Sequence, residues 1–526
     1  MTTTDRRPDE TDVLIAGAGP TGLVLALWLA RKGVRVRIVD VAAEPGTTSR
    51  ALAVQARTLE LYRQLGLAEE VVARGRRLAA ANLWVGGERR GHAAFGEMGV
   101  GISPFPFGLI FPQDEHERLL IGALGRLGVR VERRVRLERF EQARGAVVAQ
   151  LRLANGESAV CRAAYLAGCD GARSTVRQTL GTGFPGGTYS HLFYVADVDA
   201  RGRLANGELH LFLEQADFLA LFPLAGEGRV RLIGTMSAGA ETAALGEPAS
   251  GGERALGWED VSRRVLDQTR IEIDRVNWFS TYRVHHRVAS RFRDGQVFLL
   301  GDAAHIHSPV GGQGMNTGIG DAVNLAWKLA AVMGGRADGR LLDSYEPERI
   351  AFARRLVATT DRAFQVATSP GPVVRPIRTH LFPALVSRLF RLASVRRFMF
   401  RVVSQTEINY RGGELAEGQT GHVRGGDRLP WVPGESGAPG DDNFTPLASL
   451  DWQAHVYGHA GPEIAAACAA RGLPLHLFPW AAAAARAGLT EAALYLVRPD
   501  GYLGLVDPEA RPAHLDRYFE QRGLRL

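Results

Sequence analysis

The sequence predicts an α/β fold in which a mostly parallel sheet is interrupted by an antiparallel sheet and followed by a smaller α/β domain. Residues 13–40 read as strand, glycine turn, helix and strand. Residues 186–285 carry alternating apolar runs rich in aromatic side chains, which are typical of an antiparallel sheet. From about residue 445, short strand and helix patterns alternate again. With 526 residues and 46% hydrophobic content, the chain can bury the cores of two or three domains.

Composition argues against several classes of partner. The net charge is +7, but the basic residues are almost all arginine and alternate with Asp and Glu along the whole chain, while lysine occurs only at Lys32 and Lys328. We therefore predict no nucleic-acid partner. Cys161, Cys169 and Cys468 form neither a CxxC pair nor a metal-ligand spacing. The polar N-terminal segment and the Gly, Pro and Thr residues within the longest apolar stretch favour a cytoplasmic protein without a membrane anchor.

The first element is a dinucleotide-binding motif. In Gly17-x-Gly19-x-x-Gly22, the first glycine permits a tight turn, the second lets the backbone approach a pyrophosphate, and the third lets the helix pack closely on the sheet. The phosphates would lie at the N-terminus of the helix. Asp40 ends the second strand and can accept hydrogen bonds from ribose hydroxyls. These residues predict a bound dinucleotide, and both FAD and NAD satisfy them.

The remaining elements set the domain boundaries. The first α/β region extends over residues 1–185, and the antiparallel sheet occupies residues 186–285. The α/β pattern resumes over residues 286–405 with a strand, a glycine-rich turn and long helices. Residues 406–526 contain a segment rich in Gly, Pro and charge, which we interpret as a linker, and then the small α/β domain. The sheet region therefore interrupts the first domain.

Two further motifs distinguish FAD from NAD. "YLAGCDGARSTVR" places Asp170 after a short strand, and "VFLLGDAAHIHSPVGGQGMNTGIGDAVNL" places Gly301 and Asp302 after another. The three motifs, in this order and spacing, resemble those of the flavoprotein aromatic hydroxylases of the para-hydroxybenzoate hydroxylase type. The resemblance covers nearly the whole chain and is strongest to the larger members, which act on phenols and aromatic polyketides. It implies a Rossmann-like FAD-binding domain, an antiparallel β-sheet substrate domain and a thioredoxin-like C-terminal domain.

The resemblance also implies a reaction. FAD stays bound, NADPH or NADH visits transiently, and O2 adds to the reduced flavin to give a C4a-hydroperoxide that hydroxylates a phenolic or polyketide-type aromatic substrate. No metal is required. The chain agrees with a single resident dinucleotide, since only one GxGxxG opens a βαβ unit. This chemistry, together with the arginine-rich composition, suggests a role in antibiotic biosynthesis.

Several side chains are assigned to FAD by this resemblance. Arg50 would contact the phosphates or the adenosine, Gln113 the ribityl chain, and Asp302 the ribityl hydroxyls. Asp170 would organise the loop where the flavin phosphates and the visiting nucleotide meet. A turn-forming Asp-Gly pair at Asp170, and an acid that only complements a helix dipole at Asp302, are the structural alternatives.

The glycine-rich loop before the long helix is predicted to hold the isoalloxazine edge. Glycines let main-chain N–H groups approach the flavin oxygen that gains negative charge on reduction, and the helix adds its positive end. We assign the catalytic role to Pro309, Gly314, Met315 and Asn316, of which the last three also bind the cofactor together with Gly301 and Gly311. His305 and His307 are interpreted as structural.

The antiparallel sheet is predicted to supply the substrate pocket. Candidate lining residues are His191, Phe193, His210, Phe212 and Phe222. Because alternate residues of a strand face opposite sides, only about half of them should face the flavin.

Three questions stay open in the sequence. A Baeyer–Villiger oxygen insertion would use the same motifs, and a non-catalytic FAD-binding partner protein would keep them, whereas the absence of a WxWxIP stretch argues against a flavin halogenase. The C-terminal domain lacks a redox pair, because Cys468 stands alone, so packing, oligomer contact or shielding are its predicted roles. A homodimer is one alternative for the oligomeric state.

Overall fold

A computed structural model places most of the chain. The residues that it describes are 10–46, 51–94, 98–214, 217–236, 256–307, 312–368, 392–435 and 440–525. Arg50, Pro309 and Gly311 lie outside these ranges, and the side chain of His191 is likewise outside what the structure describes.

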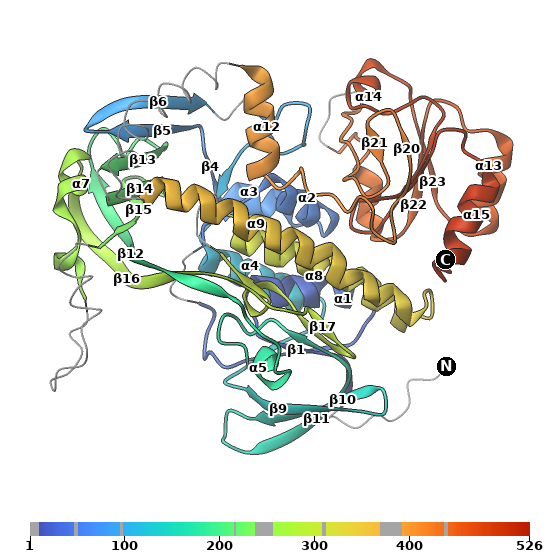
Figure 1. Ribbon diagram of the computed structural model, residues 1–526, viewed down its shortest axis with the longest axis horizontal. Coiled ribbons are helices and arrows are strands. Elements are labelled where there is room, and N and C mark those ends of the chain that lie inside the picture. Colours follow the sequence, from blue (N-terminus) through green and yellow to red (C-terminus); the bar gives the residue numbers. More distant parts are fainter. Residues whose placement is uncertain are drawn as a thin grey trace.

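The first layer is an eight-stranded sheet with the order β17-β18-β11-β1-β2-β8, to which β10 and β9 are attached through β11 (Figure 1). The central strands β18, β11, β1, β2 and β8 pair in parallel, as the βαβ pattern predicts. The bounds are β1 (Glu10–Ala16), β2 (Val36–Asp40), β8 (Val131–Arg133), β9 (Arg136–Ala143), β10 (Ala146–Arg152), β11 (Ser158–Gly168), β17 (Arg293–Asp294) and β18 (Val297–Leu299).

Helices pack on this sheet and on one another. Helix α1 is apolar on all sides and therefore lies in the interior, where it contacts α4 and α8. The long helices α8 and α9 run across the centre of the molecule in Figure 1. The bounds are α1 (Pro20–Arg31), α2 (Ala56–Gln64), α3 (Ala68–Arg74), α4 (Gln113–Arg126), α5 (Thr175–Thr179), α8 (Gly314–Met333), α9 (Tyr345–Thr368) and α12 (Ala393–Val403).

The second layer is another eight-stranded sheet, with the order β19-β16-β12-β15-β14-β13-β5-β6. Its two longest strands, β12 and β16, extend from the first domain toward α7, at the left of Figure 1. The bounds are β5 (Ala80–Val85), β6 (Glu88–Ala94), β12 (Gly186–Arg201), β13 (Leu209–Glu214), β14 (Asp217–Pro223), β15 (Arg229–Thr235), α7 (Arg263–Gln268), β16 (Glu272–Val288) and β19 (His305–Ile306). A small sheet of β3 (Ala53–Val54), β4 (Arg76–Arg77) and β7 (Leu109–Ile110) lies between the two layers.

Two strands of this sheet come from outside the region that the sequence pattern indicates. The prediction confines the sheet to residues 186–285, but β5 and β6 precede that region by about 100 residues, and β5 pairs in parallel with β13. A parallel pairing between strands so far apart in the chain leaves no turn signal in the sequence. The sequence pattern therefore does not separate β5 and β6 from the surrounding α/β region.

The C-terminal domain is a third sheet, with the order β21-β20-β25-β24-β22-β23, and the predicted hairpin at Pro499–Gly501 is confirmed. The bounds are β20 (Glu417–Thr420), β21 (Val423–Arg424), β22 (Gln453–Tyr457), α13 (Pro462–Ala470), β23 (Leu475–Phe478), α14 (Ala482–Arg486), β24 (Leu494–Val497), β25 (Leu503–Asp507) and α15 (Pro512–Gln521). Strands β20 and β21 lie in the segment interpreted as a linker, which is a correction: their sequences lack apolar alternation, and they are strands because β20 pairs with β25 and β21 pairs with β20. The predicted fold class is confirmed.

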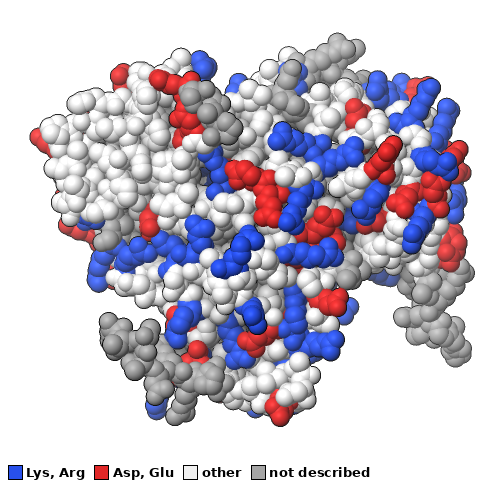
Figure 2. Space-filling view, turned by 180° about the vertical axis from the view of Figure 1, so that it is seen from behind, with Lys and Arg blue, Asp and Glu red and all other residues white. Residues whose placement is uncertain are grey.

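The surface carries mixed charge. Figure 2 shows Arg and Lys interleaved with Asp and Glu over much of one face, without a large area of a single sign. Among the described residues, none of the helices is both long and apolar enough to cross a membrane.

Candidate functional site

The glycine motif brings three elements into close contact. Gly17 has a φ of +101°, and a Cβ there would overlap the carbonyl oxygen of Cys169 in the loop after β11. A Cβ on Gly22 would overlap the carbonyl oxygen of Gly17. Both positions therefore require glycine, because α1 and the β11 loop approach the turn from opposite sides.

Gly19 differs from its two neighbours. It has φ −74° and ψ 179°, caps the N-terminus of α1, and has no atom within 4 Å of an added Cβ. Open space therefore lies directly beside the first turn of a helix, where unpaired N–H groups and the helix dipole favour a phosphate. The residues present fit a dinucleotide at this position.

Asp40 lies at the same edge of the sheet. Its Oδ2 accepts a hydrogen bond from the N–H of Ala18 (2.6 Å) and its Oδ1 one from the N–H of Ala42 (2.7 Å). Each carboxylate oxygen can accept a second bond, so the side chain keeps the capacity to bind a ribose hydroxyl.

Asp170 follows the carbonyl of Cys169 that touches the glycine turn. Its Oδ2 accepts from the N–H of Val176 (3.1 Å) at the start of α5, while its Oδ1 is buried and meets no described donor. Burial raises the pKa of this carboxyl group, against the opposing effect of hydrogen bonds from Ser174 and the backbone of Val176. Asp170 thus organises the start of α5, and its second oxygen is buried without a donor among the described residues.

Arg177 ties this loop to the next motif. It donates to the carbonyl oxygens of Ala303 (2.9 Å) and Ala172 (2.7 Å). Gly301 begins the short helix η2 (Gly301–Ala303) with a φ of +58°. The side chain of Asp302 in this helix is exposed, so the structure presents it at a surface next to the glycine motif.

Helices α1 and α8 cross at small residues beside this loop. A Cβ on Gly301 or on Gly318 would press against the hydroxyl of Thr21 in α1. The close crossing brings the start of α1 together with η2 and the start of α8, which follow it by about 280 to 300 residues in the sequence.

Gln113 is the first residue of α4 and lies against Ala51, the residue that follows Arg50. Its main-chain N–H donates to the carbonyl of Ala51 (3.1 Å), and its side chain donates to Glu117 (2.8 Å). Glu117 is buried and also accepts from the N–H of Gly46 (2.9 Å), a role that no local sequence signal indicates.

The start of α8 carries Gly314, Met315 and Asn316. The side chain of Asn316 is buried and uses all four of its bonding positions: Oδ1 accepts from the N–H of Gln55 (2.9 Å) and the hydroxyl of Thr58 (2.7 Å), and Nδ2 donates to the carbonyls of Ala53 (2.9 Å) and Gly312 (2.8 Å). This side chain therefore holds the glycine loop against β3 and α2.

The other two predicted residues at the start of α8 are Gly314 and Met315. Met315 is half-buried against the core of the first domain, and a Cβ on Gly314 would lie 3.5 Å from the imidazole of His307. Gly314 and Met315 both belong to the first turn of α8. Main-chain N–H groups at the first turn of a helix can stabilise negative charge.

The antiparallel sheet sorts the predicted pocket residues onto two faces. The inner face packs against Leu52 and Ile110 of the first domain and carries half-buried apolar side chains that include Phe222. Phe193 joins the same face, since it and the inner face share Phe218 and Tyr282. Half-buried aromatic side chains between two domains indicate space for an apolar ligand.

His210 and Phe212 lie on the outer face instead. Phe212 is 1% exposed and stacks on Trp84 (5.7 Å between ring centroids). His210 accepts from the indole N–H of Trp84 (3.2 Å) and pairs with Asn206 (3.0 Å), and burial lowers its pKa. The two residues therefore cannot line the same face as Phe193 and Phe222.

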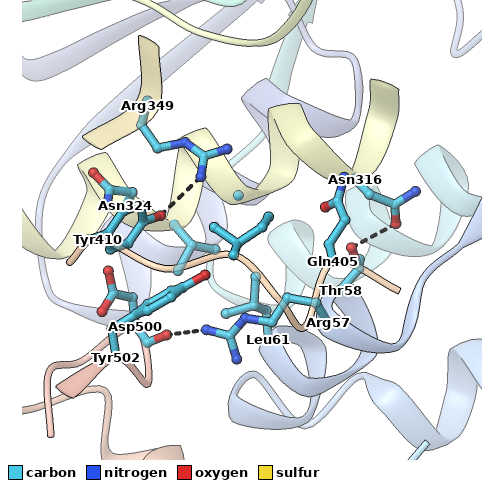
Figure 3. A pocket seen from close by; sticks show the side chains of 13 residues that line it. Arg57, Thr58, Leu61, Asn316, Asn324, Arg349, Gln405, Tyr410, Asp500 and Tyr502 are labelled. Carbon is cyan, nitrogen blue, oxygen red and sulfur yellow. Dashed lines mark hydrogen bonds between the residues drawn. The ribbon is translucent and has the colours of Figure 1, made fainter. Parts of the chain in front are cut away.

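Two hollows lie outside the open space beside Gly19, and the first of them is bordered by Asn316. A polar cavity of about 20 Å³, room for one water molecule, lies between α2, α8 and the C-terminal hairpin, and Arg57, Arg349, Asn324, Tyr410, Asp500 and Tyr502 are among the residues that line it (Figure 3). An open hollow of about 420 Å³ lies beside Trp258 and the outer end of β16. The first is too small for an aromatic substrate.

Comparisons with known proteins identify the family of this chain. Residues 10–360 match the family described as FAD binding domain. The chain is 38% identical to 6-methylpretetramide 4-monooxygenase of Streptomyces rimosus, over 70% of this chain and 66% of that protein. It is 32% identical to a flavin-dependent monooxygenase of Mycobacteroides abscessus, over 95% of this chain and 98% of that protein.

A solved structure gives the same result for the fold. Anhydrotetracycline hydroxylase from Streptomyces rimosus superposes with a TM-score of 0.77 at 28% identity, covering 98% of this chain and all of that one. The chain therefore belongs to the FAD binding domain family, within its flavin-dependent aromatic hydroxylases.

Proposed function

We propose that this protein hydroxylates a phenolic or polyketide-type aromatic compound, with electrons from NADPH or NADH and one oxygen atom from O2. The inner face of the antiparallel sheet is the observation that carries the proposal. Its half-buried aromatic side chains are continuous with Leu52 and Ala53, and Ala53 borders the glycine loop at Gly312. A flat apolar substrate placed there would lie between the sheet and the start of α8.

FAD, when bound, supplies the redox and oxygen chemistry. The protein supplies binding and orientation. In this proposal the open space at Gly19 takes the pyrophosphate, Asp40 a ribose, and Asp302 with Gln113 the ribityl chain. The first turn of α8, from Gly314 on, stabilises negative charge through its N–H groups.

In this proposal the inner face of the antiparallel sheet also excludes water. Water that reaches the activated oxygen would consume it before the oxygen is transferred to the substrate. The site must therefore exclude solvent. Aromatic side chains on the sheet face, among them Phe222, would close over the substrate and displace water from it. The roles of Arg50, Pro309 and Gly311 in this arrangement, a cytoplasmic location, a homodimer and a place in antibiotic biosynthesis stay predictions.

The test begins with the purified protein, which should retain FAD. Candidate phenols and aromatic polyketides are then screened for compounds that accelerate NADPH or NADH consumption, and the product is analysed after reaction under ¹⁸O2. A product heavier by one labelled oxygen atom, with a new phenolic carbon in its NMR spectrum, supports the proposal. A lactone of the same mass would indicate Baeyer–Villiger insertion instead. A protein that binds no flavin would refute the proposal altogether.

A further inference from the structure

A buried carboxylate on α8 connects the two halves of the candidate flavin site. Asp321 is completely buried, and its Oδ2 accepts hydrogen bonds from the N–H of Gly301 (3.0 Å) and from Nε2 of His305 (2.7 Å). Gly301 begins η2, which carries Asp302, and His305 begins β19 just beyond it. One carboxylate oxygen therefore holds both ends of the loop that presents Asp302.

The other oxygen joins this loop to the first turn of α8. Oδ1 of Asp321 accepts from Nε of Arg349 (2.6 Å), and the same guanidinium donates to the carbonyl of Thr317 (3.0 Å) and to the hydroxyl of Tyr410 (3.0 Å). Thr317 lies one residue after Asn316, whose side chain holds the glycine loop. A single buried network thus spans η2, the start of α8 and α9.

Every hydrogen-bonding neighbour of Asp321 donates to it. An ionised carboxylate can accept all of these bonds, whereas a neutral group of the same shape cannot. Burial alone would raise its pKa, but the charge of Arg349 and the bonds from His305 and Gly301 keep the pKa below its ordinary value. His305 is itself 2% exposed and stacks on Phe292 (5.9 Å), so its ring has no route to solvent.

We propose that Asp321 is a positioning residue for FAD, which fixes the loop of Asp302 at the distance from the start of α8 that the ribityl chain and the isoalloxazine edge require. This inference rests on the proposed flavin site. Gly301 adopts a φ of +58°, one of several conformations that glycine reaches without strain, and the bond from its N–H to Asp321 holds the loop in this one. His305 transmits the same constraint to β19 and, through its pairing with Val288, to β16 of the substrate sheet.

The test is Asp321→Asn in the full-length holoprotein. The amide keeps the volume but turns an NH2 group toward a donor, either Arg349 or the Gly301 and His305 pair. We expect FAD to bind about tenfold more weakly, because binding would then have to restore the position of the Asp302 loop that Asp321 holds in the wild type. The flavin that stays bound should show a shifted visible absorption band and midpoint potential, because Asp302 and α8 no longer hold their relative positions.

Glu348→Gln is the matched control. Glu348 is also a buried acid; it bonds Arg498, Lys328 and Asn324, and it faces the C-terminal hairpin instead of η2. This variant should lose thermal stability but retain the FAD affinity, absorption band and potential of the wild type. Equal losses of FAD affinity in the two variants, or no loss in Asp321→Asn, would overturn the inference.

A second pair of variants keeps the test open if Asp321→Asn does not fold. His305→Gln retains a donor toward Asp321, whereas His305→Leu removes it. We expect the leucine variant to bind FAD more weakly and the glutamine variant to recover most of the affinity. Equal affinities would refute the positioning role. A wild-type protein without FAD would instead refute the proposed function itself.

Discussion

At the scale of single residues, neighbours decide what a residue can do. Gly17 and Gly22 are tightly surrounded by backbone, whereas Gly19 between them faces open space. The same distinction separates the aspartates: Asp321 is fully bonded within the protein, and Asp170 keeps one buried oxygen without a described partner. Residues that are tightly surrounded or fully bonded maintain the fold, whereas Gly19 leaves room for a ligand beside it.

Gly19→Ala should separate binding from folding. Its backbone angles suit alanine, and no atom lies within 4 Å of the added Cβ, so the free energy of unfolding of the apoprotein should stay the same. The methyl group would occupy the space proposed for the pyrophosphate, so FAD affinity, measured by fluorescence titration, should fall by about tenfold or more.

Gly17→Ala provides the contrast. Its positive φ and the carbonyl of Cys169 leave no room for a methyl group, so the free energy of unfolding should fall by at least about 2 kcal/mol. A Gly19→Ala protein with wild-type FAD affinity would show that the phosphates lie elsewhere.

His116 should contribute to acid sensitivity. It is buried in α4, its Nε2 lies 2.6 Å from the hydroxyl of Tyr62, and burial lowers its pKa from the ordinary 6.5 to about 3. The unfolded chain therefore binds a proton that the folded chain excludes, and stability should fall as the pH decreases from about 6.5 toward 3, by at most about 1.4 kcal/mol per pH unit.

The measurement is the free energy of unfolding by denaturant across this pH range. His116→Gln should show a shallower decrease than the wild type, because glutamine does not titrate. His422 is exposed, so His422→Gln should retain the wild-type slope. A His116→Gln slope equal to that of the wild type would exclude His116 as the source.

At the scale of elements, the two faces of the antiparallel sheet have different tasks. Along β13, Leu211 faces the first domain while Phe212 packs on the outer face with Trp84. Along β14, Phe222 takes the inner face and Leu221 the outer one. Strand alternation thus places a buried core and the proposed substrate wall on the same strands.

Phe212→Ala should therefore mainly reduce stability, and Phe222→Ala should mainly change substrate binding. Phe212→Ala should cost about 3–5 kcal/mol of unfolding free energy, because it leaves a cavity in the outer core, and it should not change which substrates stimulate NADPH or NADH consumption. Phe222→Ala should cost less stability but raise the KM for the aromatic substrate or widen substrate selectivity. The reverse pattern would assign the pocket to the outer face.

At the scale of the whole molecule, the C-terminal domain is joined to the first domain by buried charges. Arg498 bonds Glu348 (2.7 and 3.0 Å) and Asp500 (3.0 and 2.7 Å), and Asp500 accepts from the indole of Trp327 (3.0 Å). Burial alone would raise the pKa of Glu348, but Arg498 and Lys328 lower it to about 2. The hydrophobic core also continues across this junction. The hairpin at Pro499–Gly501 is therefore part of the interior of the molecule.

Arg498→Met should destabilise both domains together. It leaves the charges of Glu348 and Asp500 buried without their main partner, which should cost about 3–5 kcal/mol. Calorimetry should show one transition at a lower temperature, coincident with FAD release. Arg411→Met removes an exposed pair with Asp427 on the same domain and should cost less than about 1 kcal/mol. Separate unfolding of the C-terminal domain, with FAD retained, would contradict this account.

The sequence by itself determined the elements whose signals are local. The glycine motif with Asp40, the two later Asp-Gly and Gly-Asp turns, the alternating strands and the hairpin at Pro499–Gly501 each follow from the spacing of neighbouring residues, because chain geometry over a few residues fixes them. They were enough to predict the fold class and FAD as the cofactor.

Only the tertiary structure decided the rest. The pairing of β5 with β13, the face that Phe212 occupies and the meeting of Asp321 with Gly301, His305 and Arg349 join segments that are far apart in the chain or depend on which side of a strand meets the core. No local pattern encodes such contacts, because they arise when packed layers bring distant groups into a water-free interior, where each buried donor and charge has to find a partner.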